Sequence, residues 1–362
     1  MNAAGQPGLS FEALLSAWDG EQVVIRFLPR FEAWMFIGLH SRVLGPATGG
    51  TRLKVYKTPV DGLRDALRLA EAMTLKMAIT NLPCGGGKAV LAVPTLPRGR
   101  AREHLLETYA ETVASLGGSF RTGPDLNTGP SDMDLLARRS RYVFCRSKAN
   151  GGSGDSGVHT AEGVLYAIRA SLRHVFGSPT LAGRSILVQG LGSVGASLVR
   201  LAAGEGARIL LSDIDARRAR EVAKTRGGNV VAASEATSAE CDVYAPCAVG
   251  GVLTAETIPN LRCRIVAGAA NNQLEAPLDA ELLHQAGILY APDFVSNAGG
   301  VLHAVGTEML GWRPEATKIA LAGIGDNLAA IFERSERACI STDSAARAIA
   351  AERLNIGERS KP

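Results

Sequence analysis

The chain has 362 residues, which favours two domains, because one hydrophobic core seldom grows beyond about 250–300 residues. Hydrophobic residues make up 46% and charged residues 20%, a composition that excludes a disordered or fibrous chain. The net charge of +4 is small, and the arginines of the chain lie among acidic residues. We therefore expect no nucleic-acid partner. No segment reaches the roughly 18 consecutive apolar residues of a membrane span, so we expect no membrane partner.

Two further features bear on the compartment. Residues 1–20 lack the positive and apolar segments of a secretory signal. No pair among the six cysteines has the two-residue spacing of a zinc or redox site, and the six histidines are dispersed, so we expect no metal. Reduced thiols and a cytoplasmic location are the interpretation we adopt.

The first part of the chain predicts a small sheet with helices. Residues 21–28 and 33–39 favour strands, and apolar residues at helical spacing predict a helix over 60–78. Proline and three glycines in NLPCGGGK end that helix, and residues 89–93 then favour a buried strand. Lys88 is therefore expected at a loop-to-strand junction. A second helix is predicted over 102–116.

A glycine and serine cluster at 149–157 marks the predicted domain boundary. Beyond it, strands and helices alternate, which predicts a parallel sheet. The elements expected are helices near 160–176 and from the glycine turn to 203, strands 185–189, 208–213, 242–245 and 264–267, and helices 321–332 and 343–354.

Within the second half, the segment VQGLGSVG carries the most specific motif. Gly190, Gly192 and Gly195 have the G-x-G-x-x-G spacing between a predicted strand and a predicted helix, and Asp213 follows the next strand. Glycine permits the tight turn and lets backbone N–H groups approach a pyrophosphate at the helix N-terminus. Asp213 would accept the ribose hydroxyls and repel a 2′-phosphate, which favours NAD, although Arg217 and Arg218 leave NADP open. The alternative is a glycine-rich turn without a ligand.

Lys76, Lys88 and Asp125 are candidate catalytic or binding residues. Two lysines flanking one compact loop would lower each other's pKa, and a lysine with a lowered pKa can act as a base. Each residue also has a simpler interpretation, because a lysine at a helix end is usually solvated and an aspartate after Gly-Pro is usually a turn former or helix cap.

The chain resembles the family of glutamate, leucine, phenylalanine and valine dehydrogenases, with similarity that is closest to the phenylalanine enzymes. The matching segments occur in order along nearly the whole chain: LGPATGGTR, MTLKMA, NLPCGGGK, TGPDLNT, YAPCAVGG, GAANNQL and YAPDFVSNAGG. The resemblance implies an α/β fold of two domains separated by a cleft. Residues 1–148, joined by C-terminal helices at about 325–362, would form a substrate-binding and oligomerisation domain with a mixed sheet, and residues 149–324 a Rossmann NAD-binding domain.

The resemblance also assigns roles to residues at the matching positions. Lys88 would be the base that activates water, Asp125 would handle the proton of the amino group, and Lys76 would bind the substrate carboxylate. The other residues expected to contact the amino acid are Gly49, Gly50, Met73, Pro124 and Asn271. Those expected to contact NAD are Ser156, Thr160, Gly190, Leu191, Gly192, Ser193, Val194, Gly195, Asp213, Ile214, Ala248, Val249, Ala269, Asn271 and Asn297.

The expected substrate has an apolar side chain. Glutamate-specific relatives have a lysine at the position of Thr48 and a hydroxyl residue at that of Ala304; neither is present, and Val301 adds a further apolar group to the expected pocket. The resemblance implies NAD-dependent, reversible oxidative deamination of phenylalanine or a similar aromatic amino acid to the 2-oxo acid and ammonia, by a homo-oligomer. The alternatives are a valine or leucine dehydrogenase of the same family, or a catalytically silent NAD-binding relative.

Overall fold

A computed structural model describes residues 10–359 of the chain. These residues divide into two compact units, the first made of residues 10–77 and 83–154, the second of residues 78–82 and 155–359. The chain passes from one unit to the other within the glycine and serine cluster that was expected to be the boundary. The outer ends of the expected domains, residues 1–9 and 360–362, lie outside the described residues.

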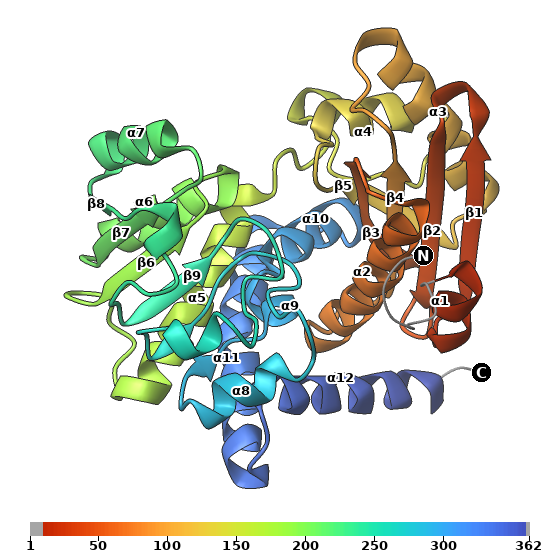
Figure 1. The fold of residues 1–362 in the computed structure, drawn as a ribbon. Coiled ribbons are helices and arrows are strands. Elements are labelled where there is room, and N and C mark those ends of the chain that lie inside the picture. The colour runs from red at the N-terminus through yellow and green to blue at the C-terminus, as the bar shows by residue number, and fades with distance from the viewer. Residues whose placement is uncertain (1–9, 360–362) are drawn as a thin grey trace, which may run out of the picture. The chain divides into compact units, whose positions relative to one another are not determined.

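The first unit contains a mixed five-stranded sheet with the order β1-β2-β4-β3-β5 (Figure 1). Strands β3, β4 and β5 are parallel, and β2 runs antiparallel to β1 and β4. The elements in chain order are α1 (Phe11–Ala17), β1 (Gln22–Leu28), β2 (Ala33–Ser41), β3 (Ala47–Lys54), α2 (Pro59–Ile79), β4 (Gly85–Ala92), α3 (Gly99–Ser115), β5 (Phe120–Pro124) and α4 (Pro130–Ala137).

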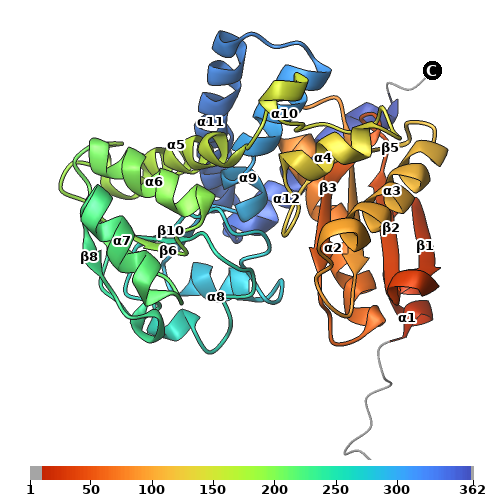
Figure 2. The same cartoon turned by 90° about the horizontal axis from the view of Figure 1, so that it is seen from above.

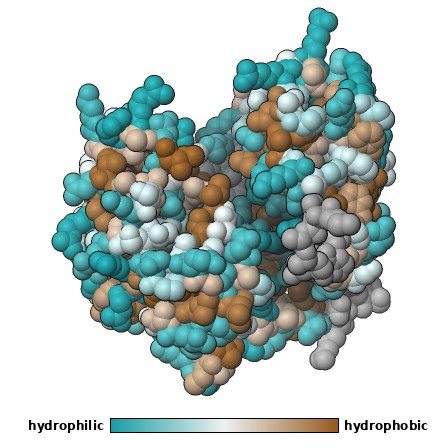
Figure 3. Space-filling view, in the orientation of Figure 1, coloured by the Kyte–Doolittle hydropathy of each residue, from teal (hydrophilic) through white to brown (hydrophobic). Residues whose placement is uncertain are grey.

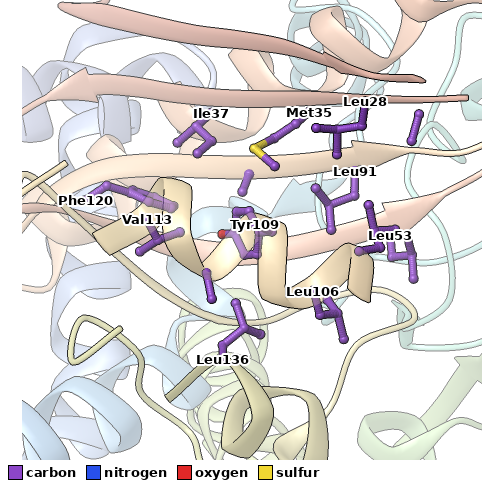
Figure 4. Packing of buried hydrophobic residues seen from close by; sticks show 14 of the residues in the cluster. Leu28, Met35, Ile37, Leu53, Leu91, Leu106, Tyr109, Val113, Phe120 and Leu136 are labelled. Carbon is purple, nitrogen blue, oxygen red and sulfur yellow. The ribbon is translucent and has the colours of Figure 1, made fainter. Parts of the chain in front are cut away.

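Each face of this sheet has its own apolar core. On one face, α3 and α4 cover a cluster that includes Met35, Leu91, Leu106 and Phe120 (Figure 4). On the other face, α2 packs Leu63 and Leu67 against Phe36, Val90 and Ala92. Since side chains alternate along a strand, residues of β4 at even numbers lie on the α2 side.

The prediction for Lys88 was wrong in its local structure. Lys88 lies in the middle of β4, paired with Gly38 of β2, and not at a junction between a loop and a strand. The glycines before it also belong to the strand, through pairing with β2 and β3, and neighbouring backbone lies close against them. A Cβ on Gly86 would be 2.1 Å from the backbone nitrogen of Thr74 in α2. Glycine here permits close packing of a helix on a strand, whereas sequence rules predict a loop from successive glycines.

The second unit contains a six-stranded parallel sheet with the order β11-β10-β9-β6-β7-β8. This order is that of a Rossmann fold, as expected. The elements are α5 (Gly157–Phe176), β6 (Ser185–Gln189), α6 (Ser193–Gly204), β7 (Arg208–Ser212), α7 (Ala216–Arg226), β8 (Asn229–Val230), β9 (Val243–Pro246), β10 (Ile265–Val266), α8 (Asp279–Gln285), β11 (Leu289–Tyr290), α9 (Asp293–Ser296), α10 (Gly299–Met309), α11 (Pro314–Ala338) and α12 (Thr342–Arg359).

Helices α11 and α12 belong to the second unit, which differs from the expectation that residues from about 325 onward join the first. The buried stripe of α11, which includes Leu321, Ile324 and Leu328, packs beside α5, and Figure 2 shows α5 between α6 and α11. A helical pattern in the sequence shows that a helix has an apolar face but does not identify the surface it covers.

No helix within residues 10–359 is long and apolar enough to cross a membrane. In Figure 3 hydrophilic residues are spread over the visible face, and apolar residues form small patches among them.

Candidate active site

Lys88 and Asp125 form a buried ion pair in the first unit. The Lys88 Nζ lies 3.0 Å from Asp125 Oδ2, and the two side chains are 6% and 14% exposed. Lys88 is in β4, and Asp125 is the first residue after β5. The structure therefore brings together the two residues expected to carry the chemistry.

Glycines in β3, the strand between β4 and β5, make this approach sterically feasible. A Cβ on Gly50 would be 2.7 Å from the carbonyl oxygen of Pro124 and 2.9 Å from the Cβ of Asp125. A Cβ on Gly49 would be 1.8 Å from the carbonyl oxygen of Gly87. All three separations are far below van der Waals contact, so any side chain at these positions would push the strands or Asp125 away.

A loop tied to β3 holds the backbone of Asp125. The Asp125 N–H donates to Thr128 Oγ1 at 2.9 Å, and this hydroxyl donates to the carbonyl oxygen of Thr51 at 2.7 Å. The Leu53 N–H donates to the carbonyl oxygen of Leu126 at 3.0 Å. The segment TGPDLNT thus fixes one aspartate next to a strand end, which is more than a surface turn requires.

Two further charged residues complete the cluster. Arg52 of β3 donates from Nε to Asp125 Oδ2 at 2.8 Å and from Nη1 to Asp65 Oδ2 at 2.9 Å. Asp65, in α2, also accepts a hydrogen bond from the hydroxyl of Tyr56. Sequence reasoning missed Arg52, Asp65 and Tyr56. A signal was present for Arg52, since it ends the matching segment LGPATGGTR two residues after Gly50, on the same side of the strand.

The environment shifts the pKa values of both members of the pair. Burial lowers the pKa of Lys88 below its ordinary value, and the charge of Arg52 adds to this, while Asp125 opposes it. Burial alone would raise the pKa of Asp125, but the neighbouring charges of Lys88 and Arg52 outweigh it and hold the pKa below its usual range. Asp125 is thus the ionised member, and Lys88 is the group able to lose a proton.

The remaining residues expected on the substrate side of the first unit are mostly buried. Lys76 and Met73 lie in α2, each 8% exposed. Thr48 in β3 is fully buried, and its hydroxyl donates to the carbonyl oxygen of Pro46 at 2.9 Å. Pro124 is the last residue of β5. Because the Thr48 hydroxyl is satisfied by backbone, it does not call for a polar group on a substrate.

The predicted phosphate turn joins β6 to α6 in the second unit. Gly190 has a φ of +93°, in the region that favours glycine, and a Cβ there would be 2.5 Å from the Cβ of Ala248. A Cβ on Gly195 would be 1.9 Å from the carbonyl oxygen of Gly190. A Cβ on Gly192 would meet nothing within 4 Å. Two glycines are therefore needed for packing of the turn, and the third faces open space where a ligand could approach the backbone.

Asp213 follows β7 and faces this turn. Its Oδ2 accepts from the Leu191 N–H at 2.8 Å, and its Oδ1 accepts from the Asp215 N–H at 2.9 Å. The Arg218 Nη1 is 3.9 Å from Asp213 Oδ2. Directly after this carboxylate, Ile214 is 96% exposed, and Val249, the residue after Ala248, is 68% exposed. Both large apolar side chains are therefore exposed to solvent.

Asn297 gathers the other expected contacts of the second unit. Its Nδ2 donates to Asn271 Oδ1 at 2.9 Å and to the carbonyl oxygen of Ala269 at 3.2 Å. Its Oδ1 is buried and has no hydrogen-bond partner among residues 10–359. A buried acceptor without a donor fits a site for a ligand amide.

Helices α5 and α10 supply the last expected residues. A Cβ on Gly300 of α10 would lie 2.5 Å from Thr160 Oγ1 and 3.1 Å from Ser156 Oγ, so these residues are packed together. Ala304 is buried in α10, and Val301, near its start, is half-buried. Ser193 and Val194 are at the start of α6, where the Ser193 hydroxyl donates to Asp155 Oδ2 at 2.8 Å. Asp155 was not predicted, although it lies in the glycine and serine cluster.

Together, a Rossmann sheet with a glycine turn and a separate mixed sheet that holds a buried Lys–Asp pair define a two-unit enzyme of the amino-acid dehydrogenase class. Comparisons with known proteins agree. The signature of the "Glu/Leu/Phe/Val dehydrogenase, dimerisation domain" matches residues 30–142, and that of the "Glutamate/Leucine/Phenylalanine/Valine dehydrogenase" matches residues 210–354. This chain belongs to the Glu/Leu/Phe/Val dehydrogenase family.

Curated relatives match along almost their whole length. The chain is 40% identical over 342 residues to an L-tryptophan dehydrogenase of Nostoc punctiforme, covering 94% of this chain and 95% of the relative. It is 42% identical over 322 residues to a valine dehydrogenase of Streptomyces albus, covering 88% and 87%. It is 35% identical over 347 residues to a leucine dehydrogenase of Geobacillus stearothermophilus, covering 96% and 94%. The crystal structure of L-tryptophan dehydrogenase from Nostoc punctiforme superposes with a TM-score of 0.78 at 38% identity, covering 97% of this chain and 100% of that one.

Proposed function

We propose that the protein catalyses the NAD-dependent, reversible oxidative deamination of an apolar L-amino acid to the 2-oxo acid and ammonia. The observation that carries this proposal is the buried Lys88–Asp125 pair, with Nζ and Oδ2 3.0 Å apart. A lysine whose pKa is lowered by burial next to an ionised carboxylate is suited to remove a proton from water. The amino-acid dehydrogenases among its relatives support the same reaction.

The residues of the second unit fit NAD, which when bound accepts a hydride from the Cα of the amino acid. Gly190, Gly192 and Gly195 would hold the pyrophosphate, and Asp213 the adenosine ribose. The exposed apolar side chains of Ile214 and Val249 offer surfaces for adenine, and Asn297 an acceptor for the carboxamide. The anionic Asp213 favours NAD over NADP, because it would repel a 2′-phosphate.

The residues of the first unit would handle the amino acid itself. Lys76 would pair with the substrate carboxylate, and Asp125 would take the proton that the amino group must lose. Lys88 in its neutral form would remove a proton from the water that attacks the iminium carbon. The carbinolamine that forms would then lose ammonia and leave the 2-oxo acid. Proton transfer between buried groups requires that bulk water be excluded.

An apolar side chain of the substrate is supported by the residues expected to surround it. The Thr48 hydroxyl donates to the carbonyl oxygen of Pro46, so it is not free to donate to a substrate group. Val301 and Ala304 are apolar. We propose an aromatic substrate, phenylalanine or a similar amino acid, first, and the branched aliphatic amino acids second. Relatives named for tryptophan and for valine and leucine represent these two choices.

The purified protein supplied with NADH, ammonia and one 2-oxo acid at a time tests this function. Oxidation of NADH that depends on both ammonia and the oxo acid is the expected result, with kcat/KM higher for phenylpyruvate and indolepyruvate than for 2-oxoisovalerate. The reverse order would identify a branched-chain enzyme and overturn the aromatic assignment. An absence of ammonia-dependent turnover with every oxo acid, while NADH still binds, would indicate a silent relative.

We also propose a cytoplasmic homo-oligomer. The matched signature of residues 30–142 is described as a dimerisation domain, and β1 is an edge strand of its sheet that another subunit could pair with. All six cysteines are free thiols, which fits a reducing compartment. A monomer in light scattering at working concentration would contradict the oligomer.

A further inference from the structure

Arg52 occupies an unusual position for an arginine. It lies within β3, on the side of the sheet that α2 covers, and only 14% of its side chain is exposed. A charge so far from water needs compensation, and here two carboxylates supply it. One is Asp125, which receives Nε, and the other is Asp65 of α2, which receives Nη1.

The two carboxylate oxygens of Asp125 have different contacts. Oδ2 receives both cations, Arg52 Nε at 2.8 Å and Lys88 Nζ at 3.0 Å. Oδ1 accepts no hydrogen bond from any residue between 10 and 359. The arginine fork is planar and rigid, so its hydrogen bonds to Asp125 and Asp65 hold Asp125 Oδ2 in place relative to α2 and favour the ionised form of the Asp125 carboxyl.

We propose that Arg52, held in turn by Asp65, is a positioning residue that anchors Asp125 through Oδ2 and leaves Oδ1 as the atom that accepts the proton of the substrate amino group. This inference rests on the proposed function, because it requires that Lys88 and Asp125 act on the substrate. It adds a second layer, made of Arg52 and Asp65, around the reacting groups. Neither residue contacts the atoms that react, and replacing either one should move those atoms. Tyr56 completes this layer by donating to Asp65.

The same layer acts on Lys88 through charge. Three charged groups in the first unit influence its pKa: Asp125 and Asp65 raise it, and Arg52 lowers it. Arg52 itself stays protonated at all working pH values, because its two carboxylate partners outweigh the effect of burial and raise its pKa. Loss of Arg52 should therefore raise the pKa of Lys88, and loss of the Asp65 charge should lower it.

The test compares the pH profile of kcat/KM for Arg52→Met, Arg52→Lys and Asp65→Asn with that of the unaltered enzyme. Activity requires neutral Lys88, so the profile has an ascending limb at the Lys88 pKa. We expect Arg52→Met to move this limb to higher pH and Asp65→Asn to move it to lower pH. In Arg52→Met, kcat should fall about 100-fold, as it does when a catalytic group is misplaced by about 1 Å. NADH affinity should be unchanged.

Arg52→Lys separates charge from geometry. It restores the positive charge, so the limb should return toward its original pH, but a single ammonium cannot bridge both carboxylates, so kcat should recover only in part. Arg64→Met is the matched control, since Arg64 lies next to Asp65 in α2, is exposed, and pairs only loosely with Asp61 at 3.5 Å. It should behave like the unaltered enzyme.

Two results would overturn the inference. In one, the ascending limbs of the pH profiles of Arg52→Met and Asp65→Asn move in the same direction. In the other, both profiles match that of Arg64→Met. If Arg52→Met does not fold, Asp65→Asn decides, because it keeps the shape of the side chain: a downward shift supports the inference and an unmoved limb refutes it. Lys88→Ala separates this from the proposed function. Normal turnover in Lys88→Ala would refute the function itself, whereas loss of turnover there with no effect of Arg52→Met would refute only the role of Arg52.

Discussion

The two candidate regions differ in the chemical groups that form them. In the second unit, the turn between β6 and α6 is made of backbone: Gly190 and Gly195 permit its close packing, and Gly192 faces open space. In the first unit, the site is made of four charged side chains, two cations and two carboxylates, that neutralise one another between the sheet and α2. A backbone site tolerates few changes of shape, whereas a charge network tolerates few changes of sign. The two regions should therefore fail in different ways when mutated.

The largest expected effect is the loss of Lys88. Lys88→Ala should reduce kcat by more than about 1,000-fold, since no other group at this position can remove a proton from water. NADH affinity should be retained, because the glycine turn belongs to the other unit. Steady-state rates and a fluorescence titration with NADH measure the two properties. Lys57→Ala, at an exposed lysine of the same unit, is the control and should leave both unchanged.

Gly192→Ala and Gly195→Ala test the backbone site as a pair. The first adds a Cβ in open space and should leave the free energy of unfolding nearly unchanged while weakening NADH binding about tenfold, a loss of roughly 1.4 kcal/mol. The second places a Cβ 1.9 Å from the carbonyl oxygen of Gly190 and should lower the free energy of unfolding by about 1–3 kcal/mol. Urea unfolding and NADH titration of both variants are the measurements. Unchanged NADH binding in folded Gly192→Ala would mean that no phosphate approaches this turn.

Asp213→Ala tests which dinucleotide the turn selects. Removing this carboxylate should raise the ratio of kcat/KM with NADP to that with NAD by about tenfold or more, because a like-charge contact with the 2′-phosphate is relieved. Asp215→Ala is a suitable control, since it removes a nearby carboxylate that caps α7 and does not face Leu191. An equal change of the ratio in both variants would indicate a general effect of charge and would remove Asp213 from the role of selector.

The same difference, between a site of backbone and a site of charged side chains, explains how much of each region could be predicted from the sequence. The turn lies within one short segment, so its spacing and flanking elements predicted it from residue types alone. The charge network joins Arg52, Asp65, Lys88 and Asp125, which are brought together only by strand pairing and by the packing of α2. For Lys88 and Asp125, the resemblance to a family identified residues that spacing alone left ambiguous. Arg52 was missed because β3, with its two glycines, was not recognised as a strand, and Asp65 because a helical pattern does not identify the side chains that a helix will meet.

The smallest expected effect concerns three hydroxyl groups near the charge network. The hydroxyls of Thr51, Tyr109 and Thr122 form a closed ring in which Thr51 donates to Tyr109 at 2.7 Å, Tyr109 donates to Thr122 at 2.9 Å, and the two threonine oxygens are 2.6 Å apart. In Tyr109→Phe the threonines keep their mutual hydrogen bond, so the free energy of unfolding should fall by only about 0.5–1.5 kcal/mol. Turnover should stay within about twofold, because the pairing of β3 with β4 and β5 already fixes the backbone at Thr51. Urea unfolding and steady-state assays check both values. A large loss of turnover with little loss of stability would show that the ring, and not the ladder of β3, sets the position of Arg52.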